Sequence, residues 1–233
     1  MKVAVITGGS KGIGYAVAAS LLKVGYSVAI TSRNIASANE AASKLVAFGD
    51  VLAIEADVKN YQSQEEAINL VLEKWGRIDV LIANAGIGSF ASIEELTLDA
   101  WHETIDTNLT GVFYSIKASL NAIKQSKGYI FTISSLAGTN FFEGGSAYNA
   151  SKFGLTGFTQ AVMLDLRKHG IKVSTIMPGS VSTYFNHHEP DQDKDSWKIQ
   201  PEDLGQLVVD MLKMPARTLP SKVEIRPTTP AGS

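Results

Sequence analysis

The sequence contains no cysteine, no long hydrophobic run and no excess of basic residues. The absence of cysteine excludes thiol catalysis, disulfide bonds and thiolate metal sites. No apolar stretch approaches the ~20 residues that a membrane-spanning helix needs, so we expect no membrane partner. The 21 Lys and Arg residues are balanced by 23 Asp and Glu residues, which gives a net charge of -2. Without a basic block, nucleic acid is not an expected partner.

The composition is that of a globular protein. Of the 233 residues, 45% are hydrophobic and 19% are charged, which excludes a disordered chain. A chain of this length typically forms one domain, and we expect a single domain over 1–226 followed by a frayed tail over 227–233. An apolar segment begins at Val3, too early for a signal peptide, so we expect a cytoplasmic protein.

Short apolar runs alternate with longer helical patterns along the chain. The predicted strands are Lys2–Thr7, Ser27–Ser32, Val51–Ala56, Ile78–Ala83, Gly128–Ser134, Lys172–Met177 and Lys222–Ile225. The predicted helices are Gly12–Val24, Ala36–Phe48, Gln62–Trp75, Thr97–Lys124, Ala147–His169 and Pro201–Met214. Because several strands are apolar throughout, we expect parallel strands that crossover helices cover on both faces. The order predicts a doubly wound α/β fold with about seven strands, and the polar stretch Asn186–Lys198 predicts a loop or lid.

A glycine-rich turn follows the first predicted strand. Gly8, Gly12 and Gly14 would allow a tight turn, a close approach of the backbone to a phosphate, and close packing of a helix on a strand. Free N–H groups at the start of the helix would then face a pyrophosphate. Glycines also end strands for purely structural reasons, but the position of this turn after the first strand favours dinucleotide binding.

The end of the second predicted strand bears on the choice of dinucleotide. An acidic residue there would bind the ribose 2′-hydroxyl of NAD, whereas an arginine accommodates the 2′-phosphate of NADP. The chain has Arg33 and no acidic residue at this place, and Lys11 adds a second cation from the glycine turn. The alternative is that Arg33 is a solvated surface residue. We predict NADP(H) as the cofactor.

Two further strand ends carry candidate cofactor contacts. Asp57 follows the third strand, where its carboxylate could accept a hydrogen bond from the adenine amino group; alternatively it is a turn residue. The fourth strand ends in Asn84-Ala85-Gly86, where small residues leave room for the cofactor. These signals are weak when each is taken alone.

A phenol and an ammonium group lie four residues apart at the start of a long predicted helix. Tyr148 and Lys152 therefore share one helical face, and a neighbouring cation favours ionisation of the phenol, whose ordinary pKa is about 10. Ser134 and Ser135 end the fifth predicted strand, at the edge of a parallel sheet that faces the ligand crevice. One of these hydroxyls could polarise a substrate carbonyl opposite Tyr148, or it could cap a helix or turn.

These residues together resemble the short-chain dehydrogenases/reductases of the single-domain type, over nearly the whole chain. The matching pieces, in the order typical of the family, are Thr-Gly-x-x-x-Gly-x-Gly at Thr7–Gly14, Asp57, Asn84–Gly86, Asn108, Ser135, Tyr-x-x-x-Lys at Tyr148–Lys152, and Pro178–Gly179. One departure is Ala83, where the family often has a second asparagine, and the segment between Thr183 and Pro201 is rather short for the family. We therefore expect a Rossmann fold with a short substrate lid over about 184–200.

The resemblance implies a role for each matching residue. Ser135 would be the catalytic serine, with Ser134 the less favoured choice, and Tyr148 would be the general acid in carbonyl reduction and the base in alcohol oxidation. Lys152 would bind the nicotinamide ribose and lower the pKa of Tyr148, and Asn108 would anchor a water that passes protons to Lys152. The implied cofactor-binding residues are Gly8, Ser10, Lys11, Gly12, Ile13, Gly14, Arg33, Asp57, Val58, Asn84, Ala85, Gly86, Tyr148, Lys152, Pro178, Gly179, Val181 and Thr183.

The expected reaction interconverts a carbonyl and an alcohol of a small-molecule substrate, and it requires no metal. The pair His187 and His188 in a polar loop is unlike a chelating site. Candidate substrate-binding residues are Ser135, Phe141, Tyr184 and Phe185, and Phe90, Leu136 and Phe142 would extend an apolar pocket. Two alternatives remain open: a 3-oxoacyl thioester reductase, and a non-enzymatic NADP-binding sensor or scaffold on the same fold.

The long helix over 147–169 predicts an oligomer, because it is apolar on two sides. One side continues from Tyr148 and Lys152 and would cover the sheet. The opposite side carries Phe153, Gly157 and Leu164 and needs another partner. We expect a homodimer or homotetramer through this helix and the predicted helix over 97–124, as is common in the family. The alternative is that neighbouring helices of the same chain cover this side.

Overall fold

Seven parallel strands form one continuous sheet in the computed structural model, which describes residues 1–191 and 193–229. The strands are β1 (Lys2–Thr7), β2 (Tyr26–Ser32), β3 (Val51–Glu55), β4 (Val80–Ala83), β5 (Tyr129–Ile133), β6 (Lys172–Pro178) and β7 (Lys222–Ile225). Their order across the sheet is β3-β2-β1-β4-β5-β6-β7. The chain reverses direction along the sheet after β3, and this switch beside β1 is where open α/β sheets bind ligands. The predicted doubly wound parallel sheet is therefore confirmed.

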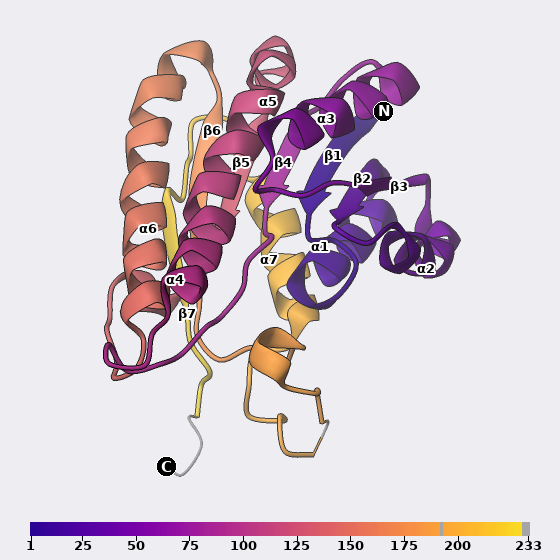
Figure 1. Cartoon of the computed structure of the whole chain (residues 1–233). Coiled ribbons are helices and arrows are strands. Elements are labelled where there is room, and N and C mark those ends of the chain that lie inside the picture. Colours follow the sequence, from indigo (N-terminus) through magenta and orange to yellow (C-terminus); the bar gives the residue numbers. More distant parts are fainter. Residues whose placement is uncertain (192, 230–233) are drawn as a thin grey trace.

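Helices cover both faces of this sheet (Figure 1). They are α1 (Gly12–Lys23), α2 (Ile35–Leu45), α3 (Tyr61–Trp75), α4 (Leu98–Ile105), α5 (Gly111–Ser126), α6 (Ser146–Leu166) and α7 (Pro201–Lys213). Short helical turns cover Val46–Phe48, Asp106–Thr110, Leu136–Gly138, Arg167–His169 and Phe185–His187. Within the described residues, no helix has the length and hydropathy that crossing a bilayer requires.

Alternation along the strands divides the apolar residues between two cores. In β1, Ala4 and Ile6 pack on one face with residues of α1 and α7, whereas Val3 and Val5 pack on the other face with residues of α3, α5 and α6. Successive side chains of a strand point to opposite faces, so a strand buried on both sides must be apolar throughout. This explains why the strands appear in the sequence as uninterrupted apolar runs.

The prediction of one helix over Thr97–Lys124 was wrong in one respect, because the structure divides this segment into two helices. A π-helical turn over Asp106–Thr110 separates α4 from α5. Within this turn Asn108 is fully buried, and its side chain hydrogen-bonds to the backbone of Ile87 instead of following the surface of a regular helix. A π-turn inserts one extra residue into a helix and frequently occurs at functional sites. The 3.6-residue pattern continues on both sides of the turn and does not reveal it.

The segment predicted as a lid is held at its two ends. Val181 and Ile199 form an isolated parallel bridge, and the N–H of Ser182 donates to the carbonyl of Ile199 at 2.9 Å. Between them, Asp195 accepts hydrogen bonds from Ser182 and Lys198 and contacts His188. Of the tail predicted to be frayed, residues 230–233 lie outside the described part of the chain.

Candidate functional site

The glycine turn lies between β1 and α1, at the carboxyl edge of the sheet. Gly8 and Gly12 have φ values of +64° and +57°, which a residue with a side chain rarely adopts. At Gly14, an added Cβ would meet the carbonyl oxygen of Gly8 and lie 2.6 Å from Nδ2 of Asn84. Two of these glycines are therefore needed for backbone conformation and one for close packing, whereas the close approach to a phosphate stays a prediction.

The N-terminus of α1 is open to a ligand. Lys11 occupies the N-cap position, and no side chain accepts a hydrogen bond from the first turn of the helix. Free N–H groups at a helix start, with the positive end of the helix dipole, are suited to bind an anion. Asn84 stabilises the start of the glycine turn, since its Nδ2 donates to the carbonyls of Thr7 and Gly8 at 2.9 and 3.0 Å.

The residues that the sequence assigns to the adenosine end lie together at the ends of β2 and β3. Arg33 directly follows β2, and its Nη1 lies 3.3 Å from Oε1 of Glu103 in α4. Asp57 follows β3, and its Oδ1 accepts a hydrogen bond from the N–H of Lys59 at 2.9 Å, as in a turn. Asp57 is therefore a turn residue, which was the alternative to adenine binding. This bond occupies only one of its two carboxylate oxygens, so it does not exclude a hydrogen bond from an adenine amino group to the other. Lys11 extends instead toward the ring of Tyr184, 5.7 Å from its centroid.

The predicted catalytic residues lie at the other end of the same edge. Tyr148 and Lys152 in the first turns of α6 are 8% and 4% exposed. The Nζ of Lys152 lies 5.7 Å from the ring centroid of Tyr148 and donates to the carbonyl of Ile133 at 2.9 Å. A phenol and an ammonium are therefore enclosed together beside the end of β5.

The two neighbouring serines point in different directions. Ser134 is buried against α6, where its hydroxyl bonds to Thr156 at 2.9 Å and to the carbonyl of Lys152 at 3.2 Å. Ser135 faces the site, where a hydrogen bond with it acts on the phenol of Tyr148. Its Oγ also accepts from the N–H of Ala137, which caps a short helical turn. The structure therefore favours Ser135 over Ser134 for contact with a substrate.

Burial determines the protonation of the pair. It raises the pKa of Tyr148 to about 12, although the hydrogen bond with Ser135 lowers it in part. Burial also lowers the pKa of Lys152 to about 8. The net effect is therefore a raised pKa, because withdrawal from water disfavours the phenolate. That Lys152 lowers the pKa of Tyr148 stays a prediction. At neutral pH the phenol is therefore protonated, ready to donate its proton.

Asn108 connects α4, α6 and the loop after β4. Its Oδ1 accepts from the N–H of Ile87 at 2.8 Å, and its Nδ2 donates to the carbonyl of Ile87 at 2.9 Å and to Ser151 at 3.1 Å. All the polar atoms of this amide are therefore engaged with the protein. Through these bonds the π-turn holds the loop at Ile87 against α6. The contact on α6 is Ser151, which lies between Tyr148 and Lys152 in the sequence.

An aromatic cluster covers the Tyr148 side of the site. The rings of Phe90 and Phe185 lie 5.4 and 5.7 Å from that of Tyr148, and Phe142 lies 5.5 Å from Phe90. Of the substrate-binding residues predicted from sequence, Phe185 and Ser135 are at this place. Phe141 is 86% exposed and has no ring contact with this cluster, and Tyr184 lies against Lys11.

The residues present fit a nicotinamide dinucleotide. The turn is a cradle that a Cβ at Gly14 would fill, and the uncapped start of α1 offers N–H groups for a pyrophosphate. Thr183 lies beside Gly12, since a Cβ built on that glycine would be 3.4 Å from it. The segment that leads into the predicted lid therefore reaches the glycine turn at Thr183. The assignment of Val181 and Thr183 to the cofactor stays a prediction.

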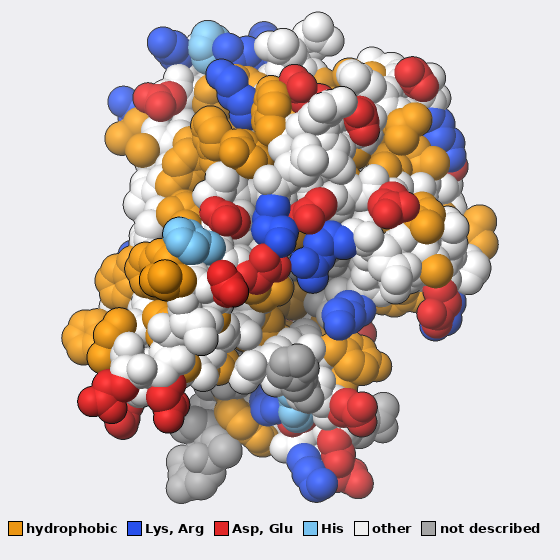
Figure 2. Space-filling view, viewed as in Figure 1, with side chains coloured by type: hydrophobic (Ala, Val, Ile, Leu, Met, Phe, Trp, Pro, Cys, Tyr) orange, Lys and Arg blue, Asp and Glu red, His pale blue; other side chains and the backbone are white. Residues whose placement is uncertain are grey.

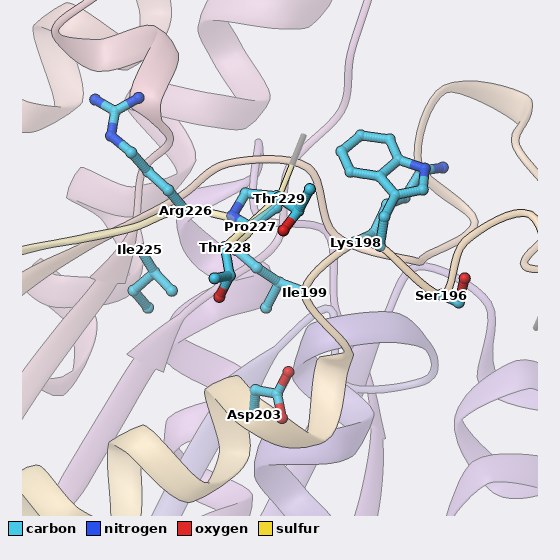
Figure 3. Close-up of a pocket in the computed structure, with 10 residues that line it drawn as sticks. Ser196, Lys198, Ile199, Asp203, Ile225, Arg226, Pro227, Thr228 and Thr229 are labelled. Carbon is cyan, nitrogen blue, oxygen red and sulfur yellow. The ribbon is translucent and has the colours of Figure 1, made fainter. Parts of the chain in front are cut away.

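Two other features are separate from this edge. A cavity of about 370 Å³ lies between the lid and the last described residues; Figure 3 shows its lining, Ser196, Lys198, Ile199, Asp203, Ile225, Arg226, Pro227, Thr228 and Thr229, with Trp197. None of the site residues predicted from sequence lines it. In residues 1–191 and 193–229, no group of three or more His, Asp or Glu side chains could hold a metal ion.

Glu103 and Lys59 belong to this site without any sequence pattern that marks them. Glu103 contacts both Arg33 and Lys59, and it is the only carboxylate that the structure places against the predicted 2′-phosphate residue in the described part of the chain. No motif marks a surface glutamate on a helix, so only the folded arrangement reveals these contacts.

Comparison with known proteins agrees with this geometry. A model of the short chain dehydrogenase family matches residues 2–194. An uncharacterised oxidoreductase of Staphylococcus saprophyticus is 32% identical over 97% of both chains. A 3-oxoacyl-[acyl-carrier-protein] reductase of Synechocystis is 38% identical over 78% of this chain and 75% of its own. The structure of an alcohol dehydrogenase from Thermococcus sibiricus, complexed with 5-hydroxy-NADP, superimposes with a TM-score of 0.92 at 31% identity, covering 98% of this chain and 97% of its own.

Proposed function

Because the chain belongs to the short-chain dehydrogenase/reductase family of oxidoreductases, we propose that it is an NADP(H)-dependent enzyme that interconverts a carbonyl and an alcohol. One observation carries this proposal: Tyr148, Ser135 and Lys152 meet at the sheet edge that also holds the glycine cradle. A proton donor and a place for a redox dinucleotide are thus combined at one edge of the sheet. Residues 1–226 act in this proposal as a single domain.

Tyr148 provides the proton for carbonyl reduction. Its phenol is protonated at neutral pH because burial holds its pKa at about 12. When bound, the nicotinamide supplies the hydride. The hydroxyls of Tyr148 and Ser135 stabilise the negative charge that develops on the substrate oxygen, and Tyr148 then donates its proton to that oxygen.

Lys152 stabilises the phenolate that remains after the proton has been donated. Its ammonium is close to the Tyr148 ring, and in the buried site this attraction is weakly screened. Asn108 acts as a positioning residue, since it holds the Ile87 loop and α6 together beside Lys152. The role in a proton-carrying water chain that the family resemblance implies for Asn108 remains part of this proposal.

The preference for NADP(H) rests on the cations at the adenosine end. Arg33 directly follows β2, Lys11 lies in the glycine turn with its side chain toward Tyr184, and no acidic residue of β2 is available for a ribose 2′-hydroxyl. The similar alcohol dehydrogenase of Thermococcus sibiricus, complexed with 5-hydroxy-NADP, supports the same choice.

The aromatic cluster favours a small apolar substrate. Phe90 and Phe185 pack on the ring of Tyr148, and Phe142 packs on Phe90; aromatic side chains provide apolar contact area with specific orientation. The second candidate is a 3-oxoacyl thioester reductase, which the Synechocystis relative favours. An acidic carrier protein would need basic residues at the entrance, but the lid pairs its two lysines, Lys194 and Lys198, with aspartates.

We also propose that the protein is a homodimer or homotetramer through α6 and the helices α4 and α5. The outer side of α6 is exposed in the described chain, with Phe153 and Leu164 42% and 52% accessible. The alternative that other helices of the same chain cover this side is therefore wrong for the described residues. Figure 2 shows hydrophobic side chains gathered on the side of the molecule that these helices form.

Replacement of Tyr148 tests the function directly. We expect Tyr148→Phe to retain NADPH binding while turnover falls by about a hundredfold or more, because only the proton donor is removed. The assay is NADPH oxidation with a panel of aldehydes, ketones, keto esters and acyl thioesters. Near-normal turnover in the variant would refute the role of Tyr148, and NADPH binding without turnover of any carbonyl by the wild type would favour the non-enzymatic sensor.

A further inference from the structure

Three charged side chains from separate elements meet at the adenosine end of the groove. The carboxylate of Glu103 in α4 places Oε1 3.3 Å from Nη1 of Arg33 and Oε2 2.6 Å from Nζ of Lys59. We refer to Arg33, Lys59 and Glu103 as the Glu103 bridge. It joins the end of β2, the turn after β3 and the last turn of α4.

The bridge lies beside the place assigned to the 2′-phosphate. β2 and β3 are adjacent parallel strands in register, with Ser32 opposite Glu55, so Arg33 and the turn after β3 project from the same edge. The glycine turn is fixed to the end of β2 as well, because the N–H of Gly9 donates to the carbonyl of Thr31 at 3.0 Å. The Glu103 bridge therefore lies at the sheet edge next to the glycine turn, which itself contributes one cation, Lys11.

Glu103 neutralises part of the positive charge that would attract a phosphate. A phosphate monoester carries about -1.5 to -2 charges at pH 7, and it needs the donors that Glu103 now occupies. The Glu103 carboxylate would also repel a phosphate bound to the same two cations, whereas a ribose 2′-hydroxyl has no charge to repel. The effect on affinity is moderate because the side chains of Arg33 and Glu103 are 57% and 38% exposed, so that water screens them.

We propose that Glu103 sets the preference between NADPH and NADH, by competing with the 2′-phosphate for Arg33 and Lys59. Lys59 is then a second cation for the 2′-phosphate, beside Arg33. The bridge lowers the affinity for NADPH but hardly changes the affinity for NADH, whose 2′-hydroxyl is neutral. The preference for NADPH over NADH is therefore smaller than Arg33 alone would produce. This inference rests on the proposed function, since it requires a nicotinamide dinucleotide in the groove.

The test is the affinity of purified protein for each cofactor, measured by calorimetry or NADPH fluorescence without any substrate. Glu103→Gln keeps the size of the side chain and removes its charge, so we expect NADPH to bind about threefold to tenfold more tightly. Lys59→Gln removes the second cation and should weaken NADPH by a similar factor. In both variants the affinity for NADH should stay within about twofold of the wild-type value.

Glu224 offers a matched control at the opposite edge of the sheet. It also contacts two cations, Lys222 and Arg226, and its side chain is 36% exposed. Glu224→Gln should change neither affinity, whereas an NADPH gain equal to that of Glu103→Gln would attribute the effect to net charge and overturn the proposal.

The outcomes separate the bridge from the enzyme function. If the wild type binds NADPH and Glu103→Gln leaves that affinity unchanged or weakens it, the role of Glu103 is refuted and the proposed function stands. If the wild type binds neither cofactor, the proposed function is refuted together with the bridge. Glu103→Ala, measured in the same way, checks that the result does not depend on new hydrogen bonds from glutamine.

Discussion

Removal of the buried ammonium of Lys152 should stabilise the protein while it abolishes activity. Burial lowers the pKa of Lys152 from 10.5 to about 8. Since each pKa unit corresponds to about 1.4 kcal/mol, the folded state carries a penalty of about 3 kcal/mol at neutral pH. Lys152→Met removes this penalty but leaves the carbonyl of Ile133 without its donor, a loss of about 1 kcal/mol. We therefore expect a net gain of about 2 kcal/mol in the free energy of unfolding.

The assay is thermal and denaturant unfolding of the wild type and the variant. For a chain of this size, a gain of about 2 kcal/mol raises Tm by roughly 4–8 °C. Lys213→Met is a suitable control, because Lys213 is exposed at the end of α7, outside the proposed interface, and its replacement should leave Tm almost unchanged. A Tm for Lys152→Met at or below the wild-type value would refute the reasoning that burial of this charge is costly.

The pH dependence gives a second test of the same penalty. The pKa of Lys152 is lower in the folded state than in the unfolded state, so the penalty is fully present below about pH 8. It decreases as the pH rises from 8 toward 10.5, because the folded protein releases its proton first. The stability of the wild type should therefore approach that of Lys152→Met between pH 7 and 9.5. The comparison ends there, because the unfolded tyrosines begin to ionise near pH 10.

Two further predictions concern the cofactor and the assembly. Arg33→Asp replaces attraction at the 2′-phosphate by repulsion and should weaken NADPH by about a hundredfold but NADH far less; equal losses in a binding titration would mean that Arg33 is only a surface residue. In sedimentation at micromolar concentration, the wild type should be a dimer or larger, and a monomer would contradict the proposed interface. Gly157→Arg adds a charged side chain to that face, where a Cβ meets no atom within 4 Å, and should yield a folded monomer.

The sheet could be predicted from the sequence because its strands are buried on both faces. Every predicted strand is present within two residues of its expected ends, since a run such as Val3–Ile6 has no other stable arrangement in a doubly wound fold. The π-turn at Asp106–Thr110 could not be predicted, because it depends on the bonds from Asn108 to Ile87, 21 residues away. Local periodicity contains no signal for a contact of that kind.

The candidate site was accessible to sequence reasoning only in part. The glycine turn and the Tyr148–Lys152 spacing are local patterns, and the structure places both at the carboxyl edge. The protonation of Tyr148 is not a local property, because it depends on how much water the fold withdraws from the phenol. Likewise, Glu103 reaches Arg33 across 70 residues of chain through a surface ion pair that no motif marks.

The two ends of the groove hold their charges in different environments, and this separates recognition from chemistry. Salt screens exposed charges over about 8 Å at physiological ionic strength, whereas it screens buried charges much less. The cations of the Glu103 bridge are partly exposed, so we expect the affinity for a 2′-phosphate to depend on ionic strength. Lys152 is enclosed, so we expect its proposed stabilisation of the Tyr148 phenolate to be independent of ionic strength. The burial that makes Lys152 costly for folding is therefore what keeps its charge effective at the site of proton transfer.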